Sequence, residues 1–165
     1  IPTGAFTNNF EYKGFDLSVF FQWSYGNDVL NANRLFFDSG FQKKRELNQY
    51  ASYTDRWTPE NPNSNIPAAT NSSSNLVISS RVVEDASFLR LKTVTLGYTV
   101  PKTFLKKYKI DNARLYVAAQ NLWTITGYSG YDPEVSIRSG GLTPGLDFSS
   151  YPRALSVSFG INLGF

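Results

Sequence analysis

The chain of 165 residues contains no Cys, no His and no Met. Without Cys and His it lacks thiol nucleophiles, Ser-His-Asp triads and the usual zinc ligands, so the commonest enzyme chemistries are excluded. Long apolar runs are also missing, because stretches such as 19–21 and 35–37 are far shorter than the roughly 18 to 20 residues of a membrane-spanning helix. The absence of Met predicts that Ile1 is not a translation start, so we expect a processed chain or part of a longer one. No signal peptide is visible in the sequence.

The chain is instead rich in aromatic residues, which make up 16% of it as 10 Tyr, 13 Phe and 3 Trp. Such a content suits stacking surfaces, and it also suits the aromatic girdles that flank the lipid-facing band of membrane strands. The net charge of +3 is mild and indicates no particular class of partner.

The last twelve residues, ALSVSFGINLGF, alternate strictly between large apolar and small or polar side chains. The apolar members are Leu155, Val157, Phe159, Ile161, Leu163 and Phe165. In a soluble sheet, so uniform an apolar face would need a covering layer. In an outer-membrane barrel, lipid covers that face and the lumen receives the polar one.

Four earlier segments alternate in a similar way, and the predicted strands lie near residues 4–13, 15–25, 86–99, 113–123 and 154–165. Lys13-Gly14 is typical of a tight hairpin turn between the first two. In the third strand the apolar parity changes between Leu91 and Val94, which predicts a β-bulge near Lys92-Thr93.

The connections between these strands alternate between short and long, and the long ones are 26–85 and 124–153. Within the first, Asp28–Tyr53 has the spacing of one or two short helices. Outer-membrane barrels also alternate, with short periplasmic turns and long extracellular loops. About five strands cannot close a barrel, since single-chain bacterial barrels begin at about 8 strands, so the chain is expected to be the final part of a larger one. We therefore predict an all-β chain: the C-terminal antiparallel strands of a large transmembrane β-barrel with long extracellular loops.

Four stretches in this order resemble the carboxy-terminal part of the SusC/RagA-like TonB-dependent outer-membrane transporters of Bacteroidetes. They are YKGFDLSVFFQWSYGNDVLN, DRWTPENPNSNIP, DASFLRLKTVTLGYTVPKTFLKK and ARLYVAAQNLWTITGYSGYDPEV. The close of the chain also resembles an outer-membrane assembly signal, whose matching positions are Ser158, Gly160, Leu163 and Phe165. The resemblance covers nearly the whole chain.

The resemblance implies a barrel of about 22 strands in the bacterial cell outer membrane, which imports nutrients such as glycan oligomers or peptides. It implies an amino-terminal plug domain, absent from these residues, and a SusD-like surface lipoprotein as a lid. The expected partners are the rest of the same barrel and its plug, this lipoprotein, TonB through the missing N-terminal part, the lipid bilayer and the outer-membrane assembly machinery. The cargo is left open.

Contacts with substrate or lid are predicted for an aromatic and an amide in the first long connection, Trp57 and Asn61, and for Tyr128 and Tyr131 in the second. The simpler interpretation is loop architecture for Trp57 and Asn61, and structural packing for Tyr128 and Tyr131. Strand parity makes a further prediction: if Leu115 and its neighbours face lipid, the opposite face lines the lumen. Its candidates are Arg114, Tyr116 and Gln120.

No catalytic, cofactor or metal site is predicted. Asp132 and Glu134 could form a carboxylate pair, but Asp132-Pro133 is more simply a turn initiator. Four lysines follow Pro101 without the arginine and aromatic interleaving of a nucleic-acid surface, and a solvated turn near lipid headgroups explains them better. The alternative function is a secreted soluble β-sheet carbohydrate-binding module. A glycoside hydrolase would need acidic residues on neighbouring strand ends.

Overall fold

The structure is a computed structural model that describes residues 1–40, 48–71, 75–136 and 145–165. Its internal contacts divide the chain into two compact units. The sheet unit comprises Ile1–Gly26, Ser87–Gly127 and Arg153–Phe165. The loop unit comprises Asn27–Ala86 and Tyr128–Pro152, which are the two long connections between the strands. None of the helices in the described residues is long and apolar enough to cross a membrane.

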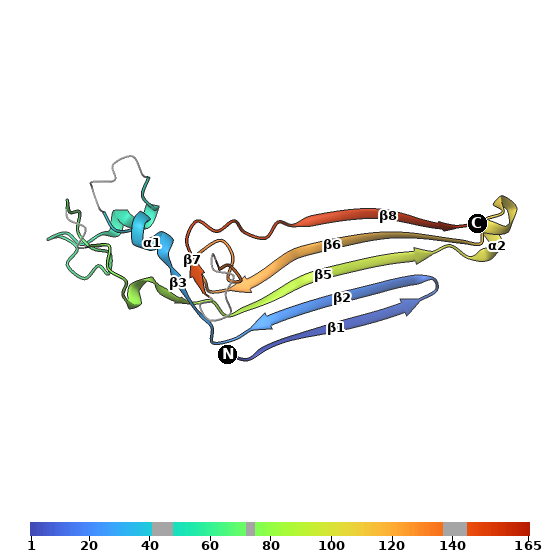
Figure 1. Cartoon of the computed structure of the whole chain (residues 1–165), viewed down its shortest axis with the longest axis horizontal. Helices are drawn as coiled ribbons and strands as arrows, with labels where there is room; N and C mark the ends of the chain where they lie inside the picture. Colours follow the sequence, from blue (N-terminus) through green and yellow to red (C-terminus); the bar gives the residue numbers. More distant parts are fainter. Residues whose placement is uncertain (41–47, 72–74, 137–144) are drawn as a thin grey trace. The chain divides into compact units, whose positions relative to one another are not determined.

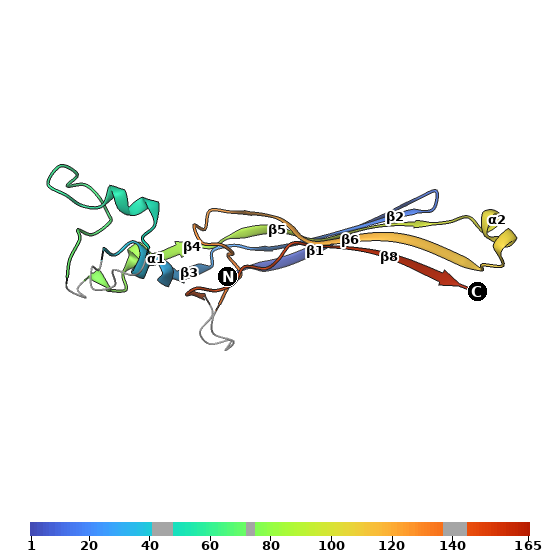
Figure 2. The same cartoon turned by 90° about the horizontal axis from the view of Figure 1, so that it is seen from above.

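The sheet unit is one antiparallel sheet of five strands in the order β1-β2-β5-β6-β8 (Figure 1). Its strands are β1 (Thr3–Tyr12), β2 (Phe15–Ser24), β5 (Phe88–Thr99), β6 (Asn112–Thr126) and β8 (Ser156–Gly164). Figure 2 shows the strands rotating relative to one another, as strand twist requires. The predicted all-β architecture with about five antiparallel strands is confirmed, and β6 continues to Thr126 because its residues remain paired with β5.

Short connections join the strands at one end of this sheet. The β1–β2 turn has positive φ at both central residues, 48° at Lys13 and 87° at Gly14, which a two-residue hairpin of the mirror-image type requires. Strands β5 and β6 are joined through α2 (Lys102–Leu105) and η5 (Lys106–Tyr108), two consecutive helical turns that begin after Pro101. Pro101 is the N-cap residue of α2, with φ −59° and ψ 135°, a position where its missing N–H leaves no intrahelical hydrogen bond unmade.

The predicted β-bulge is present in β5. Leu91 pairs with Phe21 of β2 and Thr93 pairs with Phe20, so the register skips Lys92. The register against β6 shifts at the same place. The extra residue returns the apolar side chains on both sides of it to one face, which explains the change of parity in the sequence.

The loop unit contains a second, small sheet in the order β4-β3-β7. Its elements are β3 (Asp28–Asn31), α1 (Ala32–Phe37), η2 (Ala51–Asp55), η4 (Ser80–Val82), β4 (Val83–Asp85) and β7 (Leu146–Asp147). Val29, Ala86 and Tyr128 form its buried cluster. Helices α1 and η2 fall in the segment where short helices were predicted, but Asp28–Asn31 is a strand, because it pairs with β4 and β7.

Candidate functional site

The strand register collects most of the large apolar side chains of the five strands on one face of the sheet. One row across the strands is Phe15, Tyr98, Leu115 and Ile161, and the next is Leu17, Leu96, Val117 and Phe159. Many of these side chains are exposed, and Phe159 reaches 82%. A contiguous apolar surface of this kind marks a membrane or protein interface.

The opposite face is polar, and an ion pair crosses it near the short-connection end. Arg114 on β6 donates from Nε to Oδ1 of Asp16 on β2 at 3.1 Å, and from Nη2 to Oδ2. The pair passes over Gly97 of β5, where a Cβ atom would collide with both side chains. Glycine at this position therefore allows a two-pronged contact between strands that are not neighbours.

The predicted lumen-facing residues lie together on this polar face. Tyr116 follows Arg114 on that face, and its ring fills the space where a Cβ atom at Gly160 of β8 would stand. The Arg114 guanidinium also lies 5.5 Å from the centre of the Tyr116 ring. Gln120 is on the same face, in register with Thr93 and Ser156.

The residues that resemble the assembly signal divide between the two faces. Ser158 and Gly160 are on the polar face, in register with Ala118 and Tyr116 of β6. Leu163 is on the apolar face, and Phe165 follows the end of β8 with 85% of its surface exposed. The close contact with Tyr116 is thus one physical reason for glycine at position 160.

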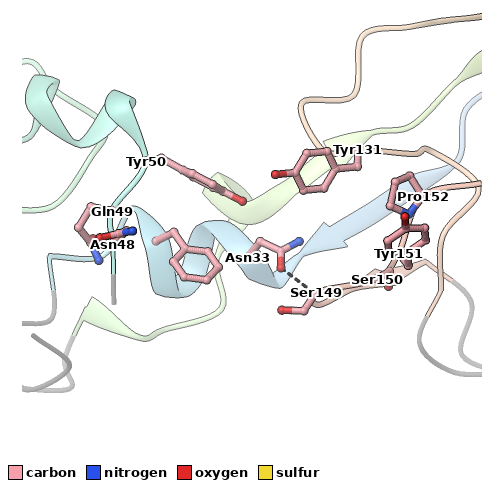
Figure 3. A pocket seen from close by; sticks show the side chains of 10 residues that line it. Asn33, Asn48, Gln49, Tyr50, Tyr131, Ser149, Ser150, Tyr151 and Pro152 are labelled. Atoms are coloured by element: carbon pink, nitrogen blue, oxygen red, sulfur yellow. Dashed lines mark hydrogen bonds between the residues drawn. The ribbon is translucent and has the colours of Figure 1, made fainter. Parts of the chain in front are cut away.

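The loop unit contains an open pocket of about 560 Å³ at α1, the segment before η2 and the residues after β7 (Figure 3). Aromatic rings and amides predominate in its lining, which includes Phe37, Asn48, Gln49, Tyr50, Tyr131 and Tyr151. Figure 3 shows the hydroxyl groups of Tyr50 and Tyr131 directed toward each other. Asn33 lies beneath them and accepts a hydrogen bond from the Ser149 backbone N–H at 2.7 Å.

A smaller polar hollow of about 240 Å³ shares Asn33, Tyr50 and Tyr131 with this pocket. Arg34 lies in its lining, and its Nε is 3.0 Å from Oε1 of Glu84. Among the described lining residues of the two hollows there is no carboxylate. Stacking on rings and hydrogen bonding to amides and hydroxyls are therefore what this site offers, which is binding chemistry.

A buried hydrogen bond holds β7, from which the chain continues into the pocket lining. The Tyr128 hydroxyl donates to Oδ2 of Asp147 at 2.7 Å, and the two residues are 6% and 2% exposed. Burial raises the pKa of Tyr128, and the hydrogen bond to Asp147 and the charge of that carboxylate raise it further. Tyr128 thus stays protonated and joins β7 to the core around Val29.

Burial also raises the pKa of Tyr50 at the mouth of the pocket, and the neighbouring Tyr131, Asp147 and Asp38 add to the effect. The Tyr50 hydroxyl is therefore a neutral donor throughout the physiological pH range. Its ring is held by Phe37 at 5.4 Å between ring centres, and its backbone N–H donates to the Phe37 carbonyl at 2.9 Å.

The structure separates the four predicted contact residues. Tyr131 lines the pocket and is 80% exposed, whereas Tyr128 is buried. Trp57 and Asn61 are outside the pocket lining. Asn61 donates from Nδ2 to the Asp55 carbonyl at 3.0 Å, so its amide is used in the architecture of its own loop.

Asp132 accepts a hydrogen bond from the Glu134 N–H at 2.9 Å, as a turn initiator does.

Several pocket residues were not found by sequence reasoning, among them Phe37, Tyr50 and Tyr151. Their only signal was aromatic character within otherwise polar connections. Tyr50 comes from the first connection and Tyr131 and Tyr151 from the second, so the pocket depends on the pairing of β3 with β7. Two-residue strands such as β7 leave no periodic pattern in a sequence.

No family model matches the chain. TonB-dependent receptor P3 of Formosa agariphila is 38% identical over 168 residues, which cover 99% of this chain and 16% of that protein. TonB-dependent receptor SusC of Bacteroides thetaiotaomicron is 30% identical over 144 residues, 78% of this chain and 14% of SusC. A solved structure of the RagAB peptide transporter matches with a TM-score of 0.82 and 30% identity, over 99% of this chain and 17% of that one.

The chain spans about a sixth of the length of these relatives. The similarity extends over nearly all of its own residues in sequence and in structure, and it includes both the sheet unit and the loop unit. Over nearly all of its residues the chain is therefore homologous to a part of the SusC/RagA-like TonB-dependent receptors.

Proposed function

We propose that this chain is the C-terminal barrel segment of an outer-membrane importer that takes up glycan oligomers or peptides together with a SusD-like lipoprotein. The observation that carries the proposal is the sheet with one apolar and one polar face, in a chain related to TonB-dependent receptors. Lipid covers the apolar face, and the polar face lines the barrel interior against the plug. The chain has no catalytic role of its own.

In this arrangement the short connections face the periplasm and the two long connections face outward. The loop unit then presents the pocket around Tyr50 and Tyr131 to nutrient or to the lipoprotein lid. Aromatic rings with adjacent amides favour a ligand that combines flat apolar surfaces with many hydrogen-bonding groups, which sugars and peptides both do. The RagAB relative is a peptide transporter, and this supports import without fixing the cargo of this chain.

The test begins with the receptor purified at its full natural length from its native membrane in mild detergent. We expect a lipoprotein of SusD type to copurify in a fixed ratio, and peptides or glycans to be released when the complex is denatured; mass spectrometry identifies both. A receptor that sediments with the outer membrane but carries neither a lipoprotein nor an oligomer would contradict the proposed partner and cargo.

Uptake of the released oligomer then tests the pocket. Tyr131→Ala should slow uptake at low concentration and leave the amount of receptor in the membrane unchanged, because Tyr131 lies in the pocket lining with 80% of its surface exposed. Trp57→Ala is the matched aromatic control, since its side chain lies outside the pocket lining. Equal uptake by the two variants would show that the pocket is not on the route of the cargo.

A further inference from the structure

A third hollow lies on the apolar face of the sheet, close to the short-connection end. Its volume is about 370 Å³, and its lining includes Phe15, Leu96, Tyr98, Leu115, Val117 and Phe159. These residues belong to two neighbouring cross-strand rows, so the hollow is a groove formed where large side chains stand apart on adjacent strands. An apolar groove of this kind suits a flexible hydrocarbon chain.

The connection at this end of the sheet combines cations with exposed aromatic rings. Four lysines, Lys102, Lys106, Lys107 and Lys109, are all exposed. Phe104 and Tyr108 stand among them with 70% and 67% of their surfaces exposed, while Leu105 is buried. Exposed aromatic rings would gain no burial in a turn that contacts only water. Basic residues mixed with exposed aromatics are instead typical of a membrane interface.

The connection adjoins the row of the sheet next to the groove. Ala113 of β6 belongs to the apolar face, in register with Leu163 and one row beyond Leu115. The Val100 N–H, where the connection begins, donates to the Ala113 carbonyl at 2.9 Å, and α2 is in contact with β6. The lysines of the connection therefore lie roughly one or two rows beyond the groove, which is about 7 to 14 Å along the strands.

The charge at this end is predominantly positive. Lys13 in the adjacent β1–β2 turn adds a fifth cation, and its Nζ lies 5.1 Å from the centre of the Tyr12 ring. The exposed acidic side chains nearby are Asp111 in the same connection and Glu11 close to the end of β1. Five basic side chains against two acidic ones favour an anionic group at the mouth of the groove.

We propose that this surface binds an anionic phospholipid, with an acyl chain in the groove and the phosphate among the lysines of the α2–η5 connection. The inference rests on the proposed function, since it needs the apolar face to lie in a bilayer. A free phosphate would use the lysines but not the groove, and a neutral lipid would use the groove but not the lysines. Only an anionic amphiphile uses both, and Phe104 and Tyr108 then lie at its glycerol level.

The test uses the receptor at its full natural length in detergent, with palmitoyl-oleoyl phosphatidylglycerol and its phosphatidylcholine counterpart as probes. Native mass spectrometry counts the molecules of each lipid that the receptor retains. We expect wild type to prefer phosphatidylglycerol. Lys106→Glu with Lys107→Glu should reduce its retention by about ten-fold or more. Lys106→Arg with Lys107→Arg keeps the charge and should keep the preference.

Val117→Trp fills the groove and should also reduce retention of phosphatidylglycerol, with every lysine intact. Equal retention of the two lipids by wild type, or unchanged retention in the Glu variant, would overturn the proposal. Complete displacement of the lipid by millimolar glycerol phosphate would overturn the role of the groove. A receptor that inserts into vesicles of neither composition would instead count against the proposed membrane function, so the two failures are distinguishable.

Discussion

Tyr128 connects the core of the loop unit to a buried carboxylate. One carboxylate oxygen of Asp147 accepts a hydrogen bond from the Tyr128 hydroxyl, while the other oxygen has no hydrogen-bond partner in the described part of the chain. The carboxylate therefore depends heavily on this single donor. A buried polar group without a hydrogen-bond partner destabilises a protein by more than one hydrogen bond stabilises it. Removal of the Tyr128 hydroxyl oxygen should therefore have a large effect.

Tyr128→Phe should reduce the stability of the loop unit by about 1–3 kcal/mol, since it leaves the Asp147 carboxylate buried without its donor. The effect should be read at the Leu30 amide, which donates to the Gly145 carbonyl next to β7. Hydrogen exchange of that amide in the full receptor should become faster. Tyr25→Phe, at an exposed tyrosine, should leave it unchanged, and unaltered exchange in Tyr128→Phe would contradict the role given to the bond.

Gly160 is a second residue with a structural role, because it has no side chain. A Cβ atom there would overlap the Tyr116 ring. Gly160→Val should therefore displace the ring and destabilise the folded barrel by about 1–3 kcal/mol, as overpacking does. The double variant with Tyr116→Ala removes the collision and should recover part of the loss. Urea unfolding in lipid vesicles measures both, and no recovery would indicate that Gly160 serves another purpose.

At the scale of a strand, successive residues of β8 alternate between the apolar and the polar face of the sheet. Phe159 lies on the apolar face in register with Val117, and Ser158 lies on the polar face in register with Ala118. Because the two positions are adjacent in the chain, they differ chiefly in the side to which they point. This makes them a matched pair for asking which face meets lipid.

Phe159→Arg should cost about 2–4 kcal/mol of folding free energy if position 159 lies near the bilayer midplane. Ser158→Arg introduces the same group on the polar face and should cost much less. Folding of the full receptor into vesicles, followed by the band shift of the folded form on unheated gels, compares the two. Equal costs would sink the assignment of the apolar face to lipid.

The sheet could be predicted from the sequence because each strand has its own alternating pattern of apolar and polar residues. Alternation located all five strands, and the change of parity around Lys92 located the bulge. It failed for the loop unit because there the partners are distant. Asp28–Asn31 is a strand only through β4 and β7. The burial of Tyr128 likewise depends on Asp147, a partner that no local pattern indicates.

At the scale of the whole molecule, the sheet has two bare edges. Within the described residues, β1 pairs only with β2 and β8 pairs only with β6. Each edge presents a row of unpaired backbone donors and acceptors, next to an uncovered apolar face. Such a sheet needs further strands on both sides before it is stable in water or in lipid.

The 165-residue chain expressed by itself should therefore aggregate, and in detergent it should give no compact band on unheated gels. The receptor at its full length should give that band under the same conditions, because its edges are paired. A soluble monomer of the 165 residues with native-like exchange protection in β1 and β8 would contradict this expectation and would revive the soluble binding module as a description of the chain.

The aromatic pocket is assembled from both long connections: Tyr50 belongs to the first, Tyr131 and Tyr151 to the second, and β3 and β7 hold the two together. If the pocket binds cargo as proposed, its specificity is inherited with both connections together and not with one of them. A chimera that exchanges one connection between two such receptors would combine half of each donor's pocket and recognise neither ligand well. Exchange of both together, with Asp147 and Tyr128 from one parent, is the smallest graft that carries specificity intact.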